Sequence, residues 1–287
     1  IVNEQAAVLM HASFTTVVRE AGDLSAGVFD RAGNMVAQAV TGTPGHINTM
    51  ANCVRHFVNL HPIDSLKLGD SLLTNDPWLA SGHLHDITVV TPVFYKGRGV
   101  GWFANTCHAM DIGGRTLGAG AREVFEEGLH IPIMRLFREG EINKDLIDIV
   151  RANVRTPDEV VGDLYAQQAG NDVGAKKLIE ALKDYGLEDI EGLAKQILDR
   201  SEVATREAIA QIPNGIYEDE VEIDGYDTPL VIRAKVTVQD RDLIVDYAGT
   251  SDQVGRGINV VYNYTHAYTT YPLKCAISPD IPNNEGS

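Results

Sequence analysis

NDPWLASGHLHDITVVTPVFYKGRGVGWFANTCHAMDIGG, the stretch from Asn75 to Gly114, decides the fold of this chain. Two runs rich in β-branched and aromatic residues, ITVVTPVF and GVGWFAN, lie on either side of the turn sequence YKGRG. Because glycine permits the tight reversal that joins two antiparallel strands, this pattern predicts a β-hairpin. Asp86 precedes the first run and His108 follows the second, so the hairpin places both side chains at its open end.

The open end of this hairpin is rich in side chains that bind divalent metal ions. The candidates are His83, His85, Asp86 and His108, with Asp76 and Asp111 close by. Imidazole nitrogen and carboxylate oxygen are the ligands of zinc, manganese and non-haem iron sites. The pattern indicates a metal site, but it is less specific than an HExxH or paired CxxC motif. A histidine near a strand end also serves as an ordinary hydrogen-bonding residue.

Two sets of ligands are compatible with the spacing. In an extended strand His83 and Asp86 point to opposite faces, so they converge only if the backbone turns. Gly82 permits such a turn. The alternative is an extended chain in which His83 and His85 share a face. The residues alone leave both arrangements open.

The composition is that of a globular protein. The chain has 287 residues, 44% of them hydrophobic, which is enough for one large or two modest domains. The net charge of −16 argues against nucleic acid and anionic membrane surfaces as partners, because their phosphates would repel it. The sequence shows no apolar run of membrane-spanning length and no signal peptide.

The cysteines and the chain ends suggest the cellular context. Cys53, Cys107 and Cys275 are too few and too scattered for a disulfide framework, so we expect a cytoplasmic protein. The chain begins inside an amphipathic pattern and ends at NNEGS. We therefore expect it to be part of a longer protein.

Hydrophobic periodicity predicts an α+β fold of mixed helices and antiparallel hairpins or sheets. We expect an α+β region with the metal site at 1–139, a helical region at 140–211, and a β-meander plus helix, truncated at the C-terminus, at 212–287. The predicted elements are a helix at 4–22, a hairpin at 25–40, a helix at 46–60, helices at 143–155, 157–185 and 188–211, a meander at about 215–250 and a helix at 262–277.

Residues 113–132 form a glycine-rich, irregular segment. Its glycines are not followed by Lys and Ser or Thr, so it is not a phosphate-binding loop of the P-loop type. It is either a segment that lines a pocket or a plain surface loop.

Several segments carry a resemblance to a known family. They read GDLSAGVFDRAGNMVAQA, GTPGHINTM, GDSLLTNDPWLASGHLHD, CHAMDIGG, VFEEGLHIP, ANVRTPDEVVGDLYAQQAGN and SPDIPNNEGS, and they cover essentially the whole chain. The chain resembles the hydantoinase B/oxoprolinase family. That family includes the B-type subunits of ATP-dependent N-methylhydantoinases and caprolactamases, part of oxoprolinase, and the alpha subunits of acetone carboxylases.

The resemblance implies a partner and a substrate class. Family members work with an A-type, hydantoinase A-like subunit of the sugar-kinase/actin class, which binds ATP and phosphorylates a carbonyl oxygen of the substrate. The expected protein is therefore the N-terminal part of the B-type subunit in a hetero-oligomeric, ATP-dependent hydrolase. Its expected substrates are cyclic amides of the hydantoin, N-methylhydantoin or oxoproline class.

The resemblance also implies a ligand set. One divalent ion, which is zinc, manganese or iron, is held by His83, Asp86 and His108, with Asp23 as the fourth ligand. This choice favours His83 over His85 and requires the turned backbone at Gly82.

Two further residues are candidates for the chemistry. His46 begins the predicted second helix, from which its side chain could reach the metal site; a capping or core role is the alternative. Glu127 adjoins Gly128 and the apolar LHIP run, which should bury it, and this favours a role as general base. A solvated charge is the alternative for Glu127.

Two other functions stay open. The first is the alpha subunit of an acetone or acetophenone-type ATP-dependent carboxylase. The second is a non-catalytic scaffold that docks the ATP-binding subunit. In a scaffold the metal site would be structural and closed by four protein ligands, whereas a catalytic site keeps an open position.

Overall fold

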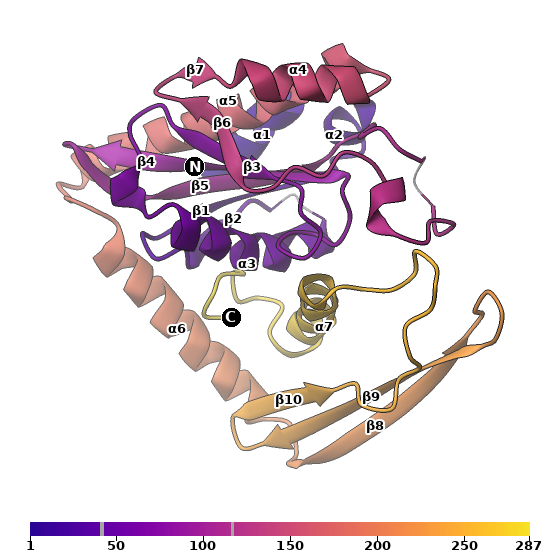
Figure 1. Cartoon of the computed structure of the whole chain (residues 1–287). Coiled ribbons are helices and arrows are strands. Elements are labelled where there is room, and N and C mark those ends of the chain that lie inside the picture. The colour runs from indigo at the N-terminus through magenta and orange to yellow at the C-terminus, as the bar shows by residue number, and fades with distance from the viewer. Residues whose placement is uncertain (41–42, 116–117) are drawn as a thin grey trace.

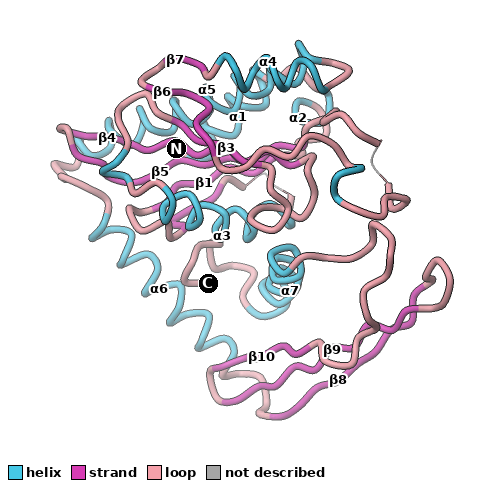
Figure 2. Tube along the Cα trace, viewed as in Figure 1, coloured by secondary structure: helices cyan, strands magenta, loops and turns pink. Residues whose placement is uncertain are grey.

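The computed structural model describes residues 1–40, 43–115 and 118–287. Within these residues, two antiparallel sheets combine with helices, as Figure 2 shows. The larger sheet has seven strands in the order β2-β1-β5-β4-β3-β6-β7, and the smaller one has three in the order β10-β9-β8. The predicted α+β fold is therefore confirmed.

The elements have the following bounds. The helices are α1 (Val2–Ala12), α2 (Thr16–Arg19), α3 (Pro44–Leu60), α4 (Lys144–Asn153), α5 (Pro157–Asp184), α6 (Glu191–Ile209) and α7 (Tyr262–Ile277). The strands of the large sheet are β1 (Leu24–Phe29), β2 (Met35–Gln38), β3 (Ser71–Thr74), β4 (Asp86–Tyr95), β5 (Arg98–His108), β6 (Met134–Arg138) and β7 (Glu141–Ile142). The small sheet consists of β8 (Gly215–Ile223), β9 (Leu230–Gln239) and β10 (Asp242–Asp246).

Helices cover both faces of the large sheet. Helices α1, α4 and α5 lie on one face and α3 on the other, with α7 beside α3 and the small sheet beyond α7 (Figure 1). Adjacent residues of β3 show the two sides: Leu73 packs in the core cluster that contains Leu164 of α5, and Leu72 packs in the one that contains Phe57 of α3. Because both faces are buried, β4 reads in sequence as a continuous apolar run.

The central hairpin brings His108 back to the level of Asp86, as the sequence predicts. Strands β4 and β5 pair along their length except at a bulge between Val93 and Phe94, which shifts the register by one residue and places Asp86 directly opposite His108. The reversal falls at Lys96 and Gly97, which both have positive φ angles, of 51° and 79°. Such a two-residue turn matches the twist of the strands that it joins.

The predicted single helix at 4–22 is wrong, because the chain breaks between α1 and α2. The carboxylate of Asp163 on α5 accepts hydrogen bonds from the backbone of Phe14, at 2.7 Å, and from the hydroxyl of Thr15, at 2.5 Å. These bonds replace the helical ones. They come from a residue distant in the sequence, so local periodicity could not reveal them.

The helical block and the meander are confirmed. All regular elements between Lys144 and Ile209 are helices, and β8, β9 and β10 form a simple antiparallel meander before α7. Strands β6 and β7, which extend the large sheet beyond β3, are not predicted from the sequence.

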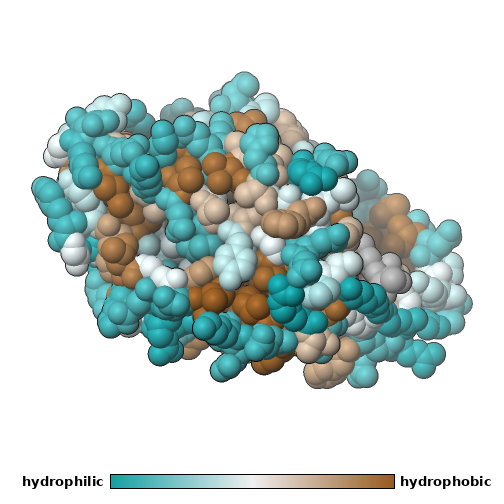
Figure 3. Space-filling view, turned by 90° about the horizontal axis from the view of Figure 1, so that it is seen from above, coloured by the Kyte–Doolittle hydropathy of each residue, from teal (hydrophilic) through white to brown (hydrophobic). Residues whose placement is uncertain are grey.

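The outer surface is mixed in character. Seen from above, apolar residues lie among hydrophilic ones over the side that carries α4 (Figure 3). No helix in the described parts of the chain combines the length and the apolar composition needed to cross a membrane.

The close contact between α5 and the sheet gives a test of the fold. A methyl group at Gly174 would lie 2.5 Å from Cδ1 of Phe103 on β5, so Gly174→Ala should lower the free energy of unfolding by ~1–3 kcal/mol. A methyl group at Gly192 of α6 would meet no atom within 4 Å, so Gly192→Ala should leave the stability unchanged or raise it by up to ~1 kcal/mol. Urea unfolding of both variants measures the difference. Equal midpoints would contradict this packing.

Candidate metal centre

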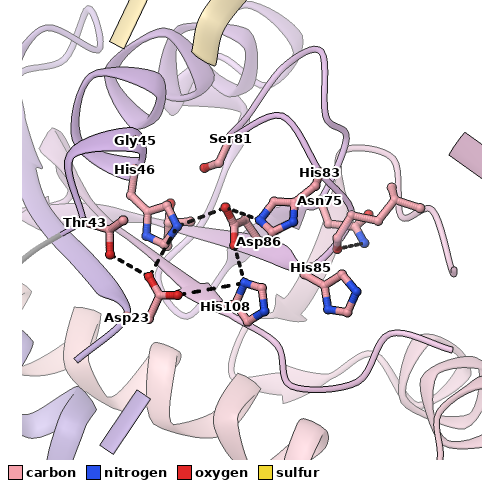
Figure 4. A network of polar contacts seen from close by, with 12 residues as sticks. Asp23, Thr43, Gly45, His46, Asn75, Ser81, His83, His85, Asp86 and His108 are labelled. Carbon is pink, nitrogen blue, oxygen red and sulfur yellow. Dashed lines mark hydrogen bonds and ion pairs between the residues drawn. The ribbon is translucent and has the colours of Figure 1, made fainter. Parts of the chain in front are cut away.

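The centre lies where three strands of the large sheet end together. Asp86 begins β4, His108 ends β5, and Asp23 immediately precedes β1, which pairs with β5. The backbone N–H of His108 donates to the carbonyl of Asp23 at 3.2 Å. Antiparallel pairing therefore brings the three side chains to one edge of the sheet, as Figure 4 shows.

The turn before β4 brings His83 to the same point. Gly82 has a φ of 94°, which a residue with a side chain rarely adopts. Asn75 holds this loop, since its side chain donates to the carbonyls of Leu84, at 2.7 Å, and Leu129, at 2.8 Å. The backbone turns, and His83 comes to lie on the same side as Asp86.

The carboxylate of Asp86 is the centre of the cluster. Its Oδ2 lies 2.8 Å from Nε2 of His83 and 2.9 Å from Nε2 of His46, and its Oδ1 lies 3.1 Å from Nδ1 of His108. The side chain is only 2% exposed. One buried carboxylate is thus surrounded by three imidazoles.

Asp23 borders this cluster. Its carboxylate lies 3.8 Å from Nε2 of His46 and 4.0 Å from Nδ1 of His108. The hydroxyl of Thr43, just before α3, donates to it at 2.6 Å. Asp23 is therefore close to the other candidates, but it is more exposed than Asp86 and farther from the imidazoles.

Burial and charge act against each other in this cluster. Burial alone would raise the pKa of Asp86, but the attraction of His46 and hydrogen bonds from three imidazoles hold that pKa well below its ordinary 3.8. Burial alone would lower the pKa of His46 and of His83, and Asp86 outweighs it, so both lie above their ordinary 6.5. The buried negative charge therefore attracts protons to the imidazoles, and a bound cation would take the place of these protons.

The donor set fits a divalent ion. One ligand atom from each of His83, Asp86 and His108 lies within 4.8 Å of the others. Atoms that each lie about 2.1 Å from one ion are roughly 3 Å apart, which is close to the separations found around Asp86. Asp23 and His46 lie outside this tightest group, yet both contact it and offer further ligand atoms.

His85 has a different environment. Its Nδ1 donates to the carbonyl of Ala109 at 2.9 Å, and its ring stacks on His108 with centroids 5.1 Å apart. Burial is the main cause that lowers its pKa below the ordinary 6.5. The backbone at residues 81–85 is turned and does not form the extended strand that the alternative assumed. The rings of His83 and His85 still lie near each other, with centroids 5.7 Å apart, but His85 is not part of the convergent group of His83, Asp86 and His108.

Glu127 lies on the far side of His83 from Asp86. Its Oε2 accepts from the backbone N–H of Leu84 at 3.0 Å, and its Oε1 lies 3.9 Å from Nδ1 of His83. The side chain is partly buried, at 23% exposure. A carboxylate in this position orients the imidazole, because the two ring nitrogens then face opposite partners.

A cavity of about 700 Å³ opens beside the centre. Its wall includes His83, Glu127, Trp78, Arg115 and Tyr262. The glycine-rich segment contributes Gly118, Ala119, Ala121, Arg122 and Glu123 to the wall. The described part of that segment therefore lines a pocket; residues 116–117 lie outside the described residues.

Sequence reasoning missed some supporting residues. Thr43, Asn75 and Tyr264 all contact the centre or the loop that carries His83. Asn75 could be suspected from its place before the histidines. Tyr264 carries no such signal, because only the tertiary fold brings α7 to this position.

Comparison with known proteins supports a family assignment. The putative D-/L-hydantoinase B-type subunit of Pseudomonas sp. strain NS671 is 32% identical over 260 residues, which cover 86% of this chain and 44% of that relative. The crystal structure of ATP-dependent caprolactamase from Pseudomonas jessenii is 27% identical and superimposes with a TM-score of 0.90, over 99% of this chain and 50% of that one. The chain thus spans about half of these relatives.

A nucleotide-free structure of acetone carboxylase shares the fold. It has a TM-score of 0.88 and 19% identity, over 99% of this chain and 40% of that one. The family model for hydantoinase B/oxoprolinase matches residues 1–287. Since that match covers every residue, the chain belongs to the hydantoinase B/oxoprolinase family.

Proposed function

We propose that this chain is part of the B-type subunit of an ATP-dependent hydrolase of cyclic amides, and that it holds one divalent ion, which is zinc, manganese or iron. The observation that carries the proposal is the convergence of His83, Asp86 and His108 beside a cavity. The hydantoinase and caprolactamase names of its relatives support the substrate class.

The proposed reaction divides activation from hydrolysis. An unstrained cyclic amide resists water, and phosphorylation of its oxygen makes the ring carbon more electrophilic. We assign that step, with ATP, to an A-type, hydantoinase A-like partner subunit in a hetero-oligomer. When bound, the divalent ion supplies Lewis-acid activation at the centre. We place the complex in the cytoplasm, which suits three cysteines that are all unpaired.

The side chains of the centre have separable roles in this proposal. His83 and Glu127 line the cavity and therefore face the substrate. Oε1 of Glu127 is the atom that either orients Nδ1 of His83 or accepts a proton from water. His46 is 4% exposed and is not among the described residues of the cavity wall, so we assign it to holding the carboxylates of Asp86 and Asp23.

The cavity favours a catalytic site over a structural one. A structural zinc site is closed by four protein ligands, whereas a catalytic site leaves one position open. His83 is 26% exposed and lies on the cavity wall. A small molecule in the cavity could therefore reach the ion, which a scaffold that only docks a partner does not require.

The products decide between hydrolase and carboxylase. The full-length protein with its A-type partner and ATP should open the ring of hydantoins, N-methylhydantoins or oxoproline. It should not carboxylate acetone or acetophenone when bicarbonate is present. Chromatography of the products measures both reactions. A carboxylated ketone without ring opening would refute the hydrolase. The absence of both products would favour the scaffold.

The ligand assignment predicts which histidines hold the metal. His83→Ala and His108→Ala should each weaken metal binding more than ~100-fold, since each removes a ligand from the convergent group. His85→Ala should retain the metal, because that ring donates to Ala109 instead. Elemental analysis of the purified variants measures the content, and circular dichroism checks their folding. Full metal in His108→Ala together with loss in His85→Ala would show the assignment to be wrong.

Metal affinity should depend on pH in a defined direction. His83 must be neutral to bind the ion, and Asp86 holds its pKa above 6.5. The pKa of His46, which contacts the same carboxylate, also lies above 6.5. Protons therefore compete with the ion even above pH 6.5. As the pH is lowered, the metal affinity should begin to fall above pH 6.5 and should continue to fall below it. Isothermal titration with Zn²⁺ or Mn²⁺ at a series of pH values measures this. A constant affinity down to about pH 6 would contradict it.

Replacement of Glu127 separates its two roles. Glu127→Gln keeps a side-chain oxygen for Leu84 but removes the charge and the basic oxygen. If Glu127 is a general base, turnover in the full complex should fall by ~100-fold or more with little change in metal content. If it orients His83, metal affinity should fall by ~10-fold or more as well. Unchanged turnover and affinity would remove Glu127 from the site.

A further inference from the structure

Helix α7 touches the metal centre through an aromatic residue. It packs along α3, below the large sheet in Figure 1. A methyl group at Gly45 would lie 2.8 Å from Cε2 of Tyr264, and one at Gly82 would lie 3.2 Å from Cβ of the same tyrosine. The Tyr264 side chain therefore lies against two glycines that belong to separate elements, the first turn of α3 and the loop before β4.

Both glycines adjoin residues of the centre. Gly45 precedes His46, and Gly82 precedes His83. These two imidazoles share one oxygen of Asp86, at 2.9 and 2.8 Å. A small change in the distance between the start of α3 and the loop would therefore move one imidazole away from Asp86. The Tyr264 side chain occupies the space that sets this distance.

The neighbouring residue fastens the same loop. The side chain of Asn263 donates to the carbonyls of Trp78, at 3.2 Å, and Leu79, at 3.0 Å. It is 6% exposed, so these bonds form in a largely dry environment. Asn263 and Tyr264 together hold the loop at two places. Asn263 also accepts a hydrogen bond from Asn52 of α3, at 3.4 Å, whereas Tyr264 contacts α3 beside His46.

The electrostatic environment agrees with this position. Burial first, then Tyr268, and then the carboxylates of Asp86 and Asp23 raise the pKa of the Tyr264 phenol. The ring therefore lies within the field of both acidic residues of the centre and stays neutral. A neutral ring fills the space beside the imidazoles without adding another negative charge near Asp86 and Asp23.

We propose that Tyr264 is a positioning residue of the metal centre, whose side chain holds His46 and His83 at the separation that metal binding requires. The proposal rests on the metal centre of the proposed function. It concerns the aromatic ring and not the hydroxyl, because both glycine contacts are made by carbon atoms of Tyr264. A tyrosine that only filled the core would affect stability but not the affinity for metal.

Metal affinity of α7 variants tests the proposal. Tyr264→Ala should weaken binding of Zn²⁺ or Mn²⁺ by ~10-fold or more, the effect typical of residues that support metal ligands. Tyr264→Phe keeps the ring and should bind within about twofold of the wild type. Tyr271→Ala, an exposed tyrosine on the same helix, is the matched control and should bind unchanged. Titration calorimetry of the folded proteins measures all four affinities.

A second variant moves the ring instead of removing it. Gly45→Ala places a methyl group against Tyr264 and should also weaken metal binding. Gly45→Ala should weaken metal binding less in the Tyr264→Ala variant than in the wild type. Tyr268 also approaches the added methyl group, at 3.0 Å, so some effect should remain. If Tyr264→Ala does not fold, Gly45→Ala alone supplies the test, because it leaves the aromatic ring in place.

The outcomes distinguish this inference from the proposed function. If the wild type binds metal and Tyr264→Ala binds it equally well, the role of Tyr264 is overturned and the metal centre is left intact. Where Tyr264→Ala is unfolded, equal binding by Gly45→Ala has the same meaning. Wild type that binds no divalent ion would overturn the proposed function, and this inference with it. Weakened binding in Tyr264→Ala, with Tyr264→Phe and Tyr271→Ala unchanged, supports the inference.

Discussion

The centre depends on the need to neutralise one buried charge, that of Asp86. A carboxylate with 2% exposure is unfavourable unless it has cationic or hydrogen-bonding partners. The hairpin, the turn at Gly82 and the start of α3 each deliver one imidazole to it. Protons on the imidazoles satisfy this charge, and in the proposed function a divalent cation would take their place.

The structural features that depend on local pattern alone could be predicted from the sequence. The hairpin from Asp86 to His108 follows from two β-rich runs and a glycine turn. Its exact register also depends on a bulge between Val93 and Phe94, which places His108 instead of Cys107 opposite Asp86 and which the local pattern does not show. The choice between His83 and His85 could not be made from the residues, because the loop is turned by the long-range bonds of Asn75. Contacts between distant segments also explain two other features that the sequence did not predict. Asp163 of α5 breaks the chain after α1, and the packing of α7 places Tyr264 beside Gly45 and Gly82.

The fold is shared more widely than any single chemistry. Structures named as a caprolactamase and as an acetone carboxylase superimpose on this chain with TM-scores of 0.90 and 0.88, at identities of 27% and 19%. A common scaffold does not by itself fix the reaction. In this chain the scaffold provides the strand ends that carry Asp86 and His108, whereas loops and α7 form the cavity wall and the support of His83. Differences in specificity should therefore lie in the loops.

The proposed ligands of the centre differ in how firmly the fold holds them. Asp86 and His108 face each other in the continuously paired part of the hairpin, between its open end and the bulge at Val93, so their separation is set by the strands. His83 lies on a turn outside the ladder, and its position depends on Asn75, Glu127 and the contact of Tyr264 with Gly82. In the proposed centre the strands preorganise Asp86 and His108, whereas the affinity for an ion would also depend on the loop that carries His83. His83 also lies on the cavity wall, so it is the proposed ligand that a molecule in the cavity would meet.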